Sequence, residues 1–124
     1  MNWKEISDKH PKAFKSMLHF LQKPFGDLLE LELEHYSPFE YFESEYCGPV
    51  YEDFGWNIRN LYDFFDENRI LISIDAYTDS QDGDIVWFDP EIFGATNNIG
   101  IYHTRPEAEA DAFEEAFKIL EERL

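Results

Sequence analysis

The sequence predicts an α+β domain: N-terminal helices, then a three-stranded antiparallel β-meander packed by a C-terminal amphipathic helix. Two observations lead to this prediction. Apolar residues recur at helical spacing in the first and last parts of the chain, and they alternate with other residues over 70–77. The 124 residues can bury one core and contain no repeat or linker, so we expect a single domain spanning residues 1–124.

The C-terminal helix has the clearest start and the clearest apolar stripe. Thr104 and Glu107 have the spacing of a capping box, in which the hydroxyl and the carboxylate each accept a hydrogen bond from a backbone N–H of the first turn. Pro106 suits that turn because its missing N–H costs nothing there. The stripe that follows needs a sheet or other helices to cover it; it consists of Phe113, Ala116, Phe117, Leu120 and Leu124.

Two helices are expected near the N-terminus. Asn2 with Glu5 predicts the start of a short first helix. His10-Pro11 interrupts it, because the residue before a proline is displaced from helical geometry, and Pro11 can begin a second helix. The apolar stripe of this second helix is Phe14, Met17, Leu18 and Leu21.

The segment 24–58 is acidic and aromatic. It contains nine acids and nine aromatic residues but no Lys or Arg. Leu and Glu alternate over 29–34, and because both are better helix formers than strand formers we expect a helix over 26–35. Ser37-Pro38 predicts another short helix through Glu45, and Cys47-Gly48-Pro49 predicts a turn.

A further helix is expected to begin at Asn57 or Asn60 and to end at Asn68, which we expect in the left-handed conformation. The apolar period then changes to two. One strand face carries Ile70, Ile72, Ile74 and Ala76, and the opposite face carries Leu71, Ser73, Asp75 and Tyr77.

Two more strands complete the predicted sheet. Asp82-Gly83 is typical of a hairpin turn, and the segment 84–88 is the expected returning strand. The segment 99–103 is the expected third strand, which leads directly into the C-terminal helix.

The charge of the chain excludes several partners. The formal net charge is -17, from 27 acids and 10 bases, so the surface repels nucleic acids and anionic membranes.

Cys47 is the single cysteine and cannot form a disulfide within the chain. The first ten residues lack the apolar segment of a secretory signal, and no apolar run is long enough to span a membrane. We therefore expect a cytoplasmic protein.

Local motifs for metal binding or catalysis are weak. Asp79, Asp82 and Asp84 place three carboxylates within six residues, but their spacing does not match an EF-hand, and a hairpin turn explains them better. Cys47 has no catalytic signature around it, and glycine-rich phosphate loops are absent. The histidines lack the spacing of metal ligands; they are His10, His19, His35 and His103. We expect no cofactor, and paired carboxylates from distant segments stay open.

Three segments carry a resemblance to known proteins. They are Trp3–Lys9 with Pro11–Phe14, Asn60–Glu67, and Thr104–Glu109 with Ala112-Phe113 and Ile119–Glu121. Together they resemble small uncharacterised proteins encoded by phages and prophages of gut bacteria. The resemblance implies a few strands with a C-terminal helix, and it implies no activity, cofactor or catalytic residue.

Three functional hypotheses follow. The first is a non-catalytic accessory domain, of phage or prophage origin, that works through protein contacts. The second is an acidic mimic of DNA, because carboxylates on an aromatic scaffold can imitate phosphate spacing and occupy the basic groove of a DNA-binding host protein. Its partner-binding residues would be Glu40, Tyr41, Glu43, Glu45 and Tyr46. The third is a small enzyme or metal-binding protein with a carboxylate site.

A simpler interpretation of the acidic segment competes with the mimic and is favoured. In it, the aromatic side chains fill the core between the N-terminal helices and the sheet while the acids face water. A homodimer is also consistent with the sequence, since a three-stranded sheet covered on one side leaves its second face available.

Overall fold

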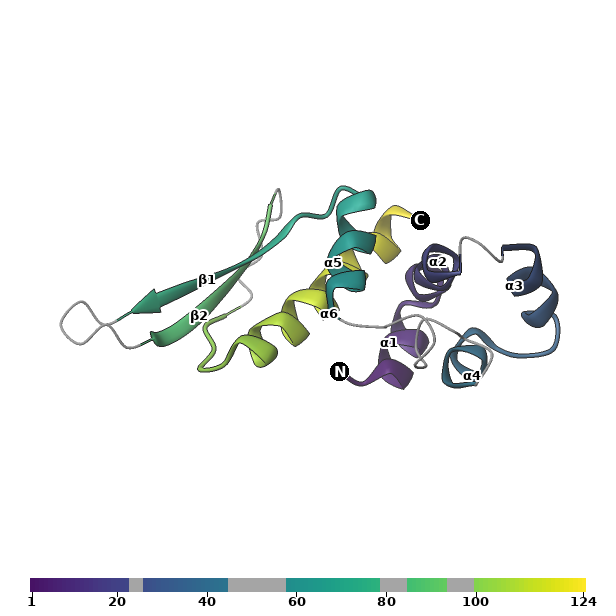
Figure 1. Cartoon of the computed structure of the whole chain (residues 1–124), viewed down its shortest axis with the longest axis horizontal. Helices are drawn as coiled ribbons and strands as arrows, with labels where there is room; N and C mark the ends of the chain where they lie inside the picture. The colour runs from purple at the N-terminus through teal and green to yellow at the C-terminus, as the bar shows by residue number, and fades with distance from the viewer. Residues whose placement is uncertain (23–25, 45–57, 79–84, 94–99) are drawn as a thin grey trace.

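Helices form one end of the molecule and a two-stranded antiparallel sheet forms the other in the computed structural model (Figure 1). The structure describes residues 1–22, 26–44, 58–78, 85–93 and 100–124. Its helices are α1 (Trp3–Lys9), α2 (Pro11–Leu21), α3 (Gly26–Glu32), α4 (Pro38–Glu43), α5 (Ile58–Glu67) and α6 (Arg105–Arg123), and its strands are β1 (Ile72–Thr78) and β2 (Ile85–Ile92). The α+β class, the N-terminal helices and the C-terminal helix are confirmed. Along the described residues, no helix combines the length and apolar character needed to cross a membrane.

Two helices begin as their capping residues predict. The Asn2 side chain accepts a hydrogen bond from the Glu5 backbone N–H at 3.1 Å, which starts α1. The Thr104 hydroxyl accepts one from the Glu107 N–H at 3.4 Å, which starts α6. Only this hydroxyl half of the predicted Thr104 capping box forms, so the first turn of α6 is capped from one side.

Helix α2 is capped from a distant part of the chain. His10 occupies its N-cap position but contributes no side-chain cap, and Pro11 has no N–H to satisfy. The backbone N–H of Ala13 donates instead to Glu121 Oε1 of α6, at 2.8 Å. A carboxylate at this end of a helix also faces the positive end of the helix dipole. This bond therefore ties the start of α2 to the last turns of α6.

The core is built from aromatic side chains that meet around α6. Phe117 is fully buried and contacts the rings of Phe65 at 5.0 Å, Trp3 at 6.1 Å and Phe64 at 6.2 Å between centroids. Phe113 stacks on Phe65 at an interplanar angle of 14°. The small residues of α6 let neighbouring elements approach closely, and the buried ones are Ala108, Ala112 and Ala116. The predicted apolar stripe of α6 is thus confirmed, with the exception of Leu124, which is exposed.

The end of α5 differs from the prediction. Asn68 does not take the left-handed conformation; Arg69 does, with φ 60°. The Asn68 side chain instead donates to the Phe64 carbonyl at 2.9 Å, and this carbonyl also accepts from the Asn68 backbone N–H at 3.3 Å. The turn then places Ile70 in the core, 1% exposed, immediately before β1.

In the sheet, β1 is paired with β2. The cross-strand pairs Ile72–Ile92, Ile74–Pro90 and Ala76–Phe88 lie on one face, which we call the inner face. Helix α6 contacts both strands. The guanidinium carbon of Arg105 lies 5.1 Å from the Phe88 ring centroid, which places this inner face toward α6. The predicted alternation is confirmed. The Asp82-Gly83 turn lies outside the described residues.

The expected third strand is represented by one bridge among the described residues. Tyr102 and Phe88 exchange two backbone hydrogen bonds, with N–O distances of 2.7 and 2.9 Å. Gly100 precedes this bridge with φ 127°, a conformation open to glycine and strained for other residues. The described part of the sheet therefore has two strands. Residue 99 and the loop before it lie outside the described residues.

Candidate interaction face

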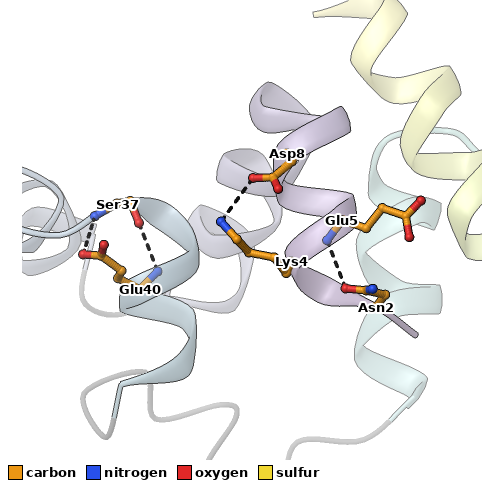
Figure 2. A network of polar contacts seen from close by, with 6 residues as sticks. All are labelled: Asn2, Lys4, Glu5, Asp8, Ser37 and Glu40. Atoms are coloured by element: carbon orange, nitrogen blue, oxygen red, sulfur yellow. Dashed lines mark hydrogen bonds and ion pairs between the residues drawn. The ribbon is translucent and has the colours of Figure 1, made fainter.

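Helix α4 carries three of the five residues predicted to bind a partner. Tyr41 is 4% exposed and belongs to the core, so its ring is used for packing. Glu40 is exposed, but its carboxylate accepts from the Ser37 N–H at 3.4 Å while the Ser37 hydroxyl accepts from the Glu40 N–H at 3.2 Å (Figure 2). This capping box fixes the Glu40 side chain at the start of its own helix. Glu43 is exposed on the same helix, and Glu45 and Tyr46 lie outside the described residues.

A cation also lies next to this helix. The Lys4 ammonium of α1 is 3.4 Å from Asp8 (Figure 2). It also lies 5.3 Å from the centroid of the Phe39 ring of α4. A cation paired with Asp8 therefore lies beside the candidate carboxylates of α4. Phe42 is buried as well, which agrees with the simpler interpretation that the aromatic residues of the acidic segment fill the core.

The structure describes only part of the other predicted candidates. Cys47 and the segment 79–84 lie outside the described residues. Among the histidines, His19 Nε2 lies 2.9 Å from Glu30 Oε1 and joins α2 to α3. Within the described ranges, no group of three or more His, Cys, Asp or Glu side chains could hold a metal ion.

A shallow groove of about 370 Å³ lies between the end of α1 and α6. Lys9 and Asp111, two of the charged residues that line it, bond to other side chains. Lys9 bonds to Glu5, and this hydrogen bond raises the pKa of the Lys9 ammonium. The Tyr102 hydroxyl donates to Asp111, and partial burial together with this bond raises the pKa of Tyr102 to about 12. Both groups therefore keep their protons at neutral pH and act as structural links.

The second face of the sheet has a different composition. We call it the outer face; it consists of Ser73, Asp75 and Tyr77 of β1, of Trp87, Asp89 and Glu91 of β2, and of Leu71 and Phe93, which lie directly beyond the paired strand ends. Its side chains are exposed or half-buried, whereas Phe88, Pro90 and Ile92 of β2 are buried on the inner face. Alternation along the strands places these two sets on opposite sides.

Like charges oppose one another at the centre of this outer face. The strand register pairs Asp75 directly with Asp89, and Glu91 lies one pair further along. Directly opposed like charges destabilise an antiparallel pair. No Lys or Arg occurs between Ile70 and Thr104, and none of these three carboxylates forms an ion pair within the described part of the chain. No Lys or Arg of the sheet therefore neutralises these acids.

Apolar side chains flank the acids at both ends of the outer face. Tyr77 stacks on Trp87, with centroids 5.3 Å apart and an interplanar angle of 18°, and Tyr77 is 40% exposed. At the other end Leu71 is 48% and Phe93 81% exposed, and the Phe93 N–H donates to the Leu71 carbonyl at 2.8 Å. Ile101 is 68% exposed and directly precedes Tyr102, whose backbone bridges Phe88.

The charges that act on the Tyr77 hydroxyl are those of the three outer-face acids. Desolvation raises the pKa of Tyr77, and the charges of Asp89, Asp75 and Glu91 raise it further. Three carboxylates therefore act on one aromatic hydroxyl at the exposed end of the sheet.

Sequence reasoning identified half of this face. The alternation over 70–77 already grouped Leu71, Ser73, Asp75 and Tyr77, but the partners from β2 depend on the strand register. The absence of any Lys or Arg from Ile70 to Thr104 was the available signal that these acids have no local counter-charge.

Comparison of the chain with protein-family models, with curated protein sequences and with solved structures finds no significant match.

Proposed function

We propose that the protein is a non-catalytic accessory domain that binds a basic partner protein through the outer face of its sheet. The observation that carries this proposal is the exposure of large apolar side chains on the face that α6 does not cover; they are Leu71, Tyr77 and Phe93. They lie on both sides of the central acids, and exposed apolar patches rimmed by polar residues are typical of protein interaction sites.

The charge of the face selects the class of partner. Asp75, Asp89 and Glu91 lie between the apolar ends and lack bases of their own sheet. A second copy of this chain would bring the same carboxylates against each other, and nucleic acids and anionic membranes carry the same sign. A protein surface that combines Lys or Arg with apolar residues complements both features.

The acidic-mimic hypothesis is a narrower version of the same function. Glu40 is engaged in a capping box, Tyr41 is buried, and Lys4 lies against Phe39, so α4 offers this hypothesis little support. The outer face supports an acidic docking surface better, because its carboxylates are uncompensated.

The remaining features of the proposal rest on sequence and local geometry. We infer that the segment 99–103 is a third strand, which the paired hydrogen bonds between Tyr102 and Phe88 support. A phage or prophage origin rests on the resemblance of the three segments named above, and a cytoplasmic location rests on the sequence arguments alone.

A pull-down with matched variants tests the proposed function. The bait proteins are the wild type, an outer-face variant with Leu71→Ser and Phe93→Ser, and a control with Leu31→Ser and Ile58→Ser, which removes exposed apolar residues elsewhere. Lysate of a candidate host is applied at low and at moderate salt, and captured proteins are quantified by mass spectrometry. Thermal melts of all three baits serve to check that each is folded.

The expected result is a basic protein that the wild type and the control retain, that the outer-face variant loses, and that salt releases. If all three baits capture the same proteins in the same amounts, the outer face is not the binding surface and the proposal is wrong.

A further inference from the structure

The outer face has an internal order that goes beyond its overall charge. Along the strands it presents the apolar pair Leu71 and Phe93, then Ser73 with Glu91, then the Asp75–Asp89 pair, then the stacked Tyr77–Trp87 pair. Residues 71 and 77 are six apart, which corresponds to about 20 Å of extended chain. Apolar surface therefore lies at both ends and negative charge lies in the middle.

We propose that this face binds an extended segment of its partner with the pattern apolar–x–basic–x–basic–x–aromatic, where x is any residue. The proposal rests on the proposed function and specifies the chemistry of the partner for that same surface. Every second side chain of an extended segment points to one side, so about seven residues bring four side chains against the four pairs of the outer face.

Each position of this pattern has its own physical counterpart. The apolar residue covers Leu71 and Phe93, which are among the most exposed large apolar side chains of the described chain. The two basic residues face Glu91 and the Asp75–Asp89 pair, and a cation between two opposed carboxylates relieves their repulsion.

The final position faces the stacked rings of Tyr77 and Trp87. An aromatic residue there extends the stack, and the neighbouring cation gains from the ring faces as well as from the carboxylates. A segment with the same residues in another order would place its basic side chains against apolar surface and its apolar side chains against the carboxylates. Order, as well as composition, should therefore decide affinity.

Three fluorescein-labelled peptides test this inference by fluorescence anisotropy with the complete chain. The matched peptide is Leu-Thr-Arg-Thr-Arg-Thr-Phe. The reordered peptide, Arg-Thr-Leu-Thr-Phe-Thr-Arg, has the same composition and net charge. The charge-reversed peptide replaces each Arg by Glu. Sedimentation velocity of the protein alone reports self-association.

The matched peptide is expected to bind about tenfold more tightly than the reordered one, and the charge-reversed peptide is expected not to bind. Asp75→Asn with Asp89→Asn should weaken the matched peptide about threefold to tenfold, since exposed ion pairs each contribute modestly. The control variant with Asp66→Asn and Glu122→Gln removes the same charge from exposed positions elsewhere and should bind like the wild type.

The outcomes separate this inference from the proposed function. If a partner captured from lysate depends on the outer face while matched and reordered peptides bind equally or not at all, the sequence pattern is wrong and the proposed function stands. If neither partner nor peptide depends on the outer face, both are wrong. Self-association that the Asp75 and Asp89 changes alter would identify the face as a contact between copies and would overturn the inference.

Discussion

The helical part of the molecule and the sheet use their apolar residues in opposite ways. Around α6, the rings of Phe65, Phe113 and Phe117 are fully buried and contact one another. On the sheet, the inner face buries Phe88, Pro90 and Ile92 of β2, while the outer face exposes Leu71, Tyr77 and Phe93 together with opposed acids. The buried contacts that stabilise the fold are therefore concentrated in the helices. The destabilising features, which are exposed apolar side chains and directly opposed carboxylates, are concentrated on the outer face of the sheet.

The largest contrast is expected between Phe117→Ala and Phe93→Ala. Phe117 is completely buried among three other rings, so its truncation should lower the free energy of unfolding by about 3–5 kcal/mol. Phe93 is 81% exposed, so the same change should alter stability by less than about 0.5 kcal/mol. Urea denaturation followed by circular dichroism measures both. Equal losses would show that the two regions do not differ as described.

The next effect concerns the bond between the two ends of the helical part. Glu121→Ala should cost about 1–2 kcal/mol, because it removes the acceptor that caps Ala13 of α2. Glu121→Gln keeps an oxygen acceptor and should cost less. Glu122→Gln, one residue further on and exposed, is the matched control and should be close to neutral in the same denaturation experiment. A neutral Glu121→Ala would contradict the capping role.

A smaller, pH-dependent effect is expected where the two regions meet. Tyr102 bridges β2 and donates its hydroxyl to Asp111 of α6. Tyr102→Phe should cost about 0.5–1 kcal/mol near neutral pH.

The sign of the pH dependence follows from the raised pKa of Tyr102, about 12 compared with about 10 for an unfolded tyrosine. The protonated hydroxyl is the stabilising form, so its contribution is complete below pH 10 and disappears as the pH rises to 12. Denaturation of wild type and Tyr102→Phe at pH 8 and pH 11.5 should give a smaller difference at the higher pH. A difference that grew with pH would contradict this assignment.

The smallest predicted change is a gain. Asp75→Asn with Asp89→Asn removes a like-charge pair from directly opposed positions and should raise stability by up to about 1 kcal/mol. Amide hydrogen exchange of β1 and thermal melts measure it. The same variant is expected to bind the matched peptide more weakly, so increased stability together with reduced affinity would indicate that these carboxylates are kept for binding. Decreased stability would mean that the two carboxylates are not opposed in solution.

The parts of the fold that sequence reasoning predicted are those set by nearby residues. The caps at Asn2, Ser37 and Thr104 lie within four residues of the groups they satisfy, and all three are present. The alternation over 70–77 assigned strand faces correctly for the same reason.

What sequence reasoning could not predict depends on contacts between distant segments. The cap from Glu121 to Ala13 and the bond from the Tyr62 hydroxyl to Glu109, at 2.7 Å, join residues far apart in the chain. Tyr41 illustrates the difficulty at the candidate site, because an aromatic residue in an acidic segment is equally suited to the surface and to the core. Only its packing against the N-terminal helices decides the question.

The bond between Ala13 and Glu121 also constrains the order of events during synthesis. The acceptor is made 108 residues after the donor, so the start of α2 has no such cap while the intervening chain is being translated. The ring contact between Trp3 of α1 and Phe117 of α6, 6.1 Å between centroids, follows the same order, since it also joins an early and a late segment. The nascent chain must therefore hold its apolar N-terminal helices incompletely covered until the last helix emerges, and completion of the core is a late, long-range step.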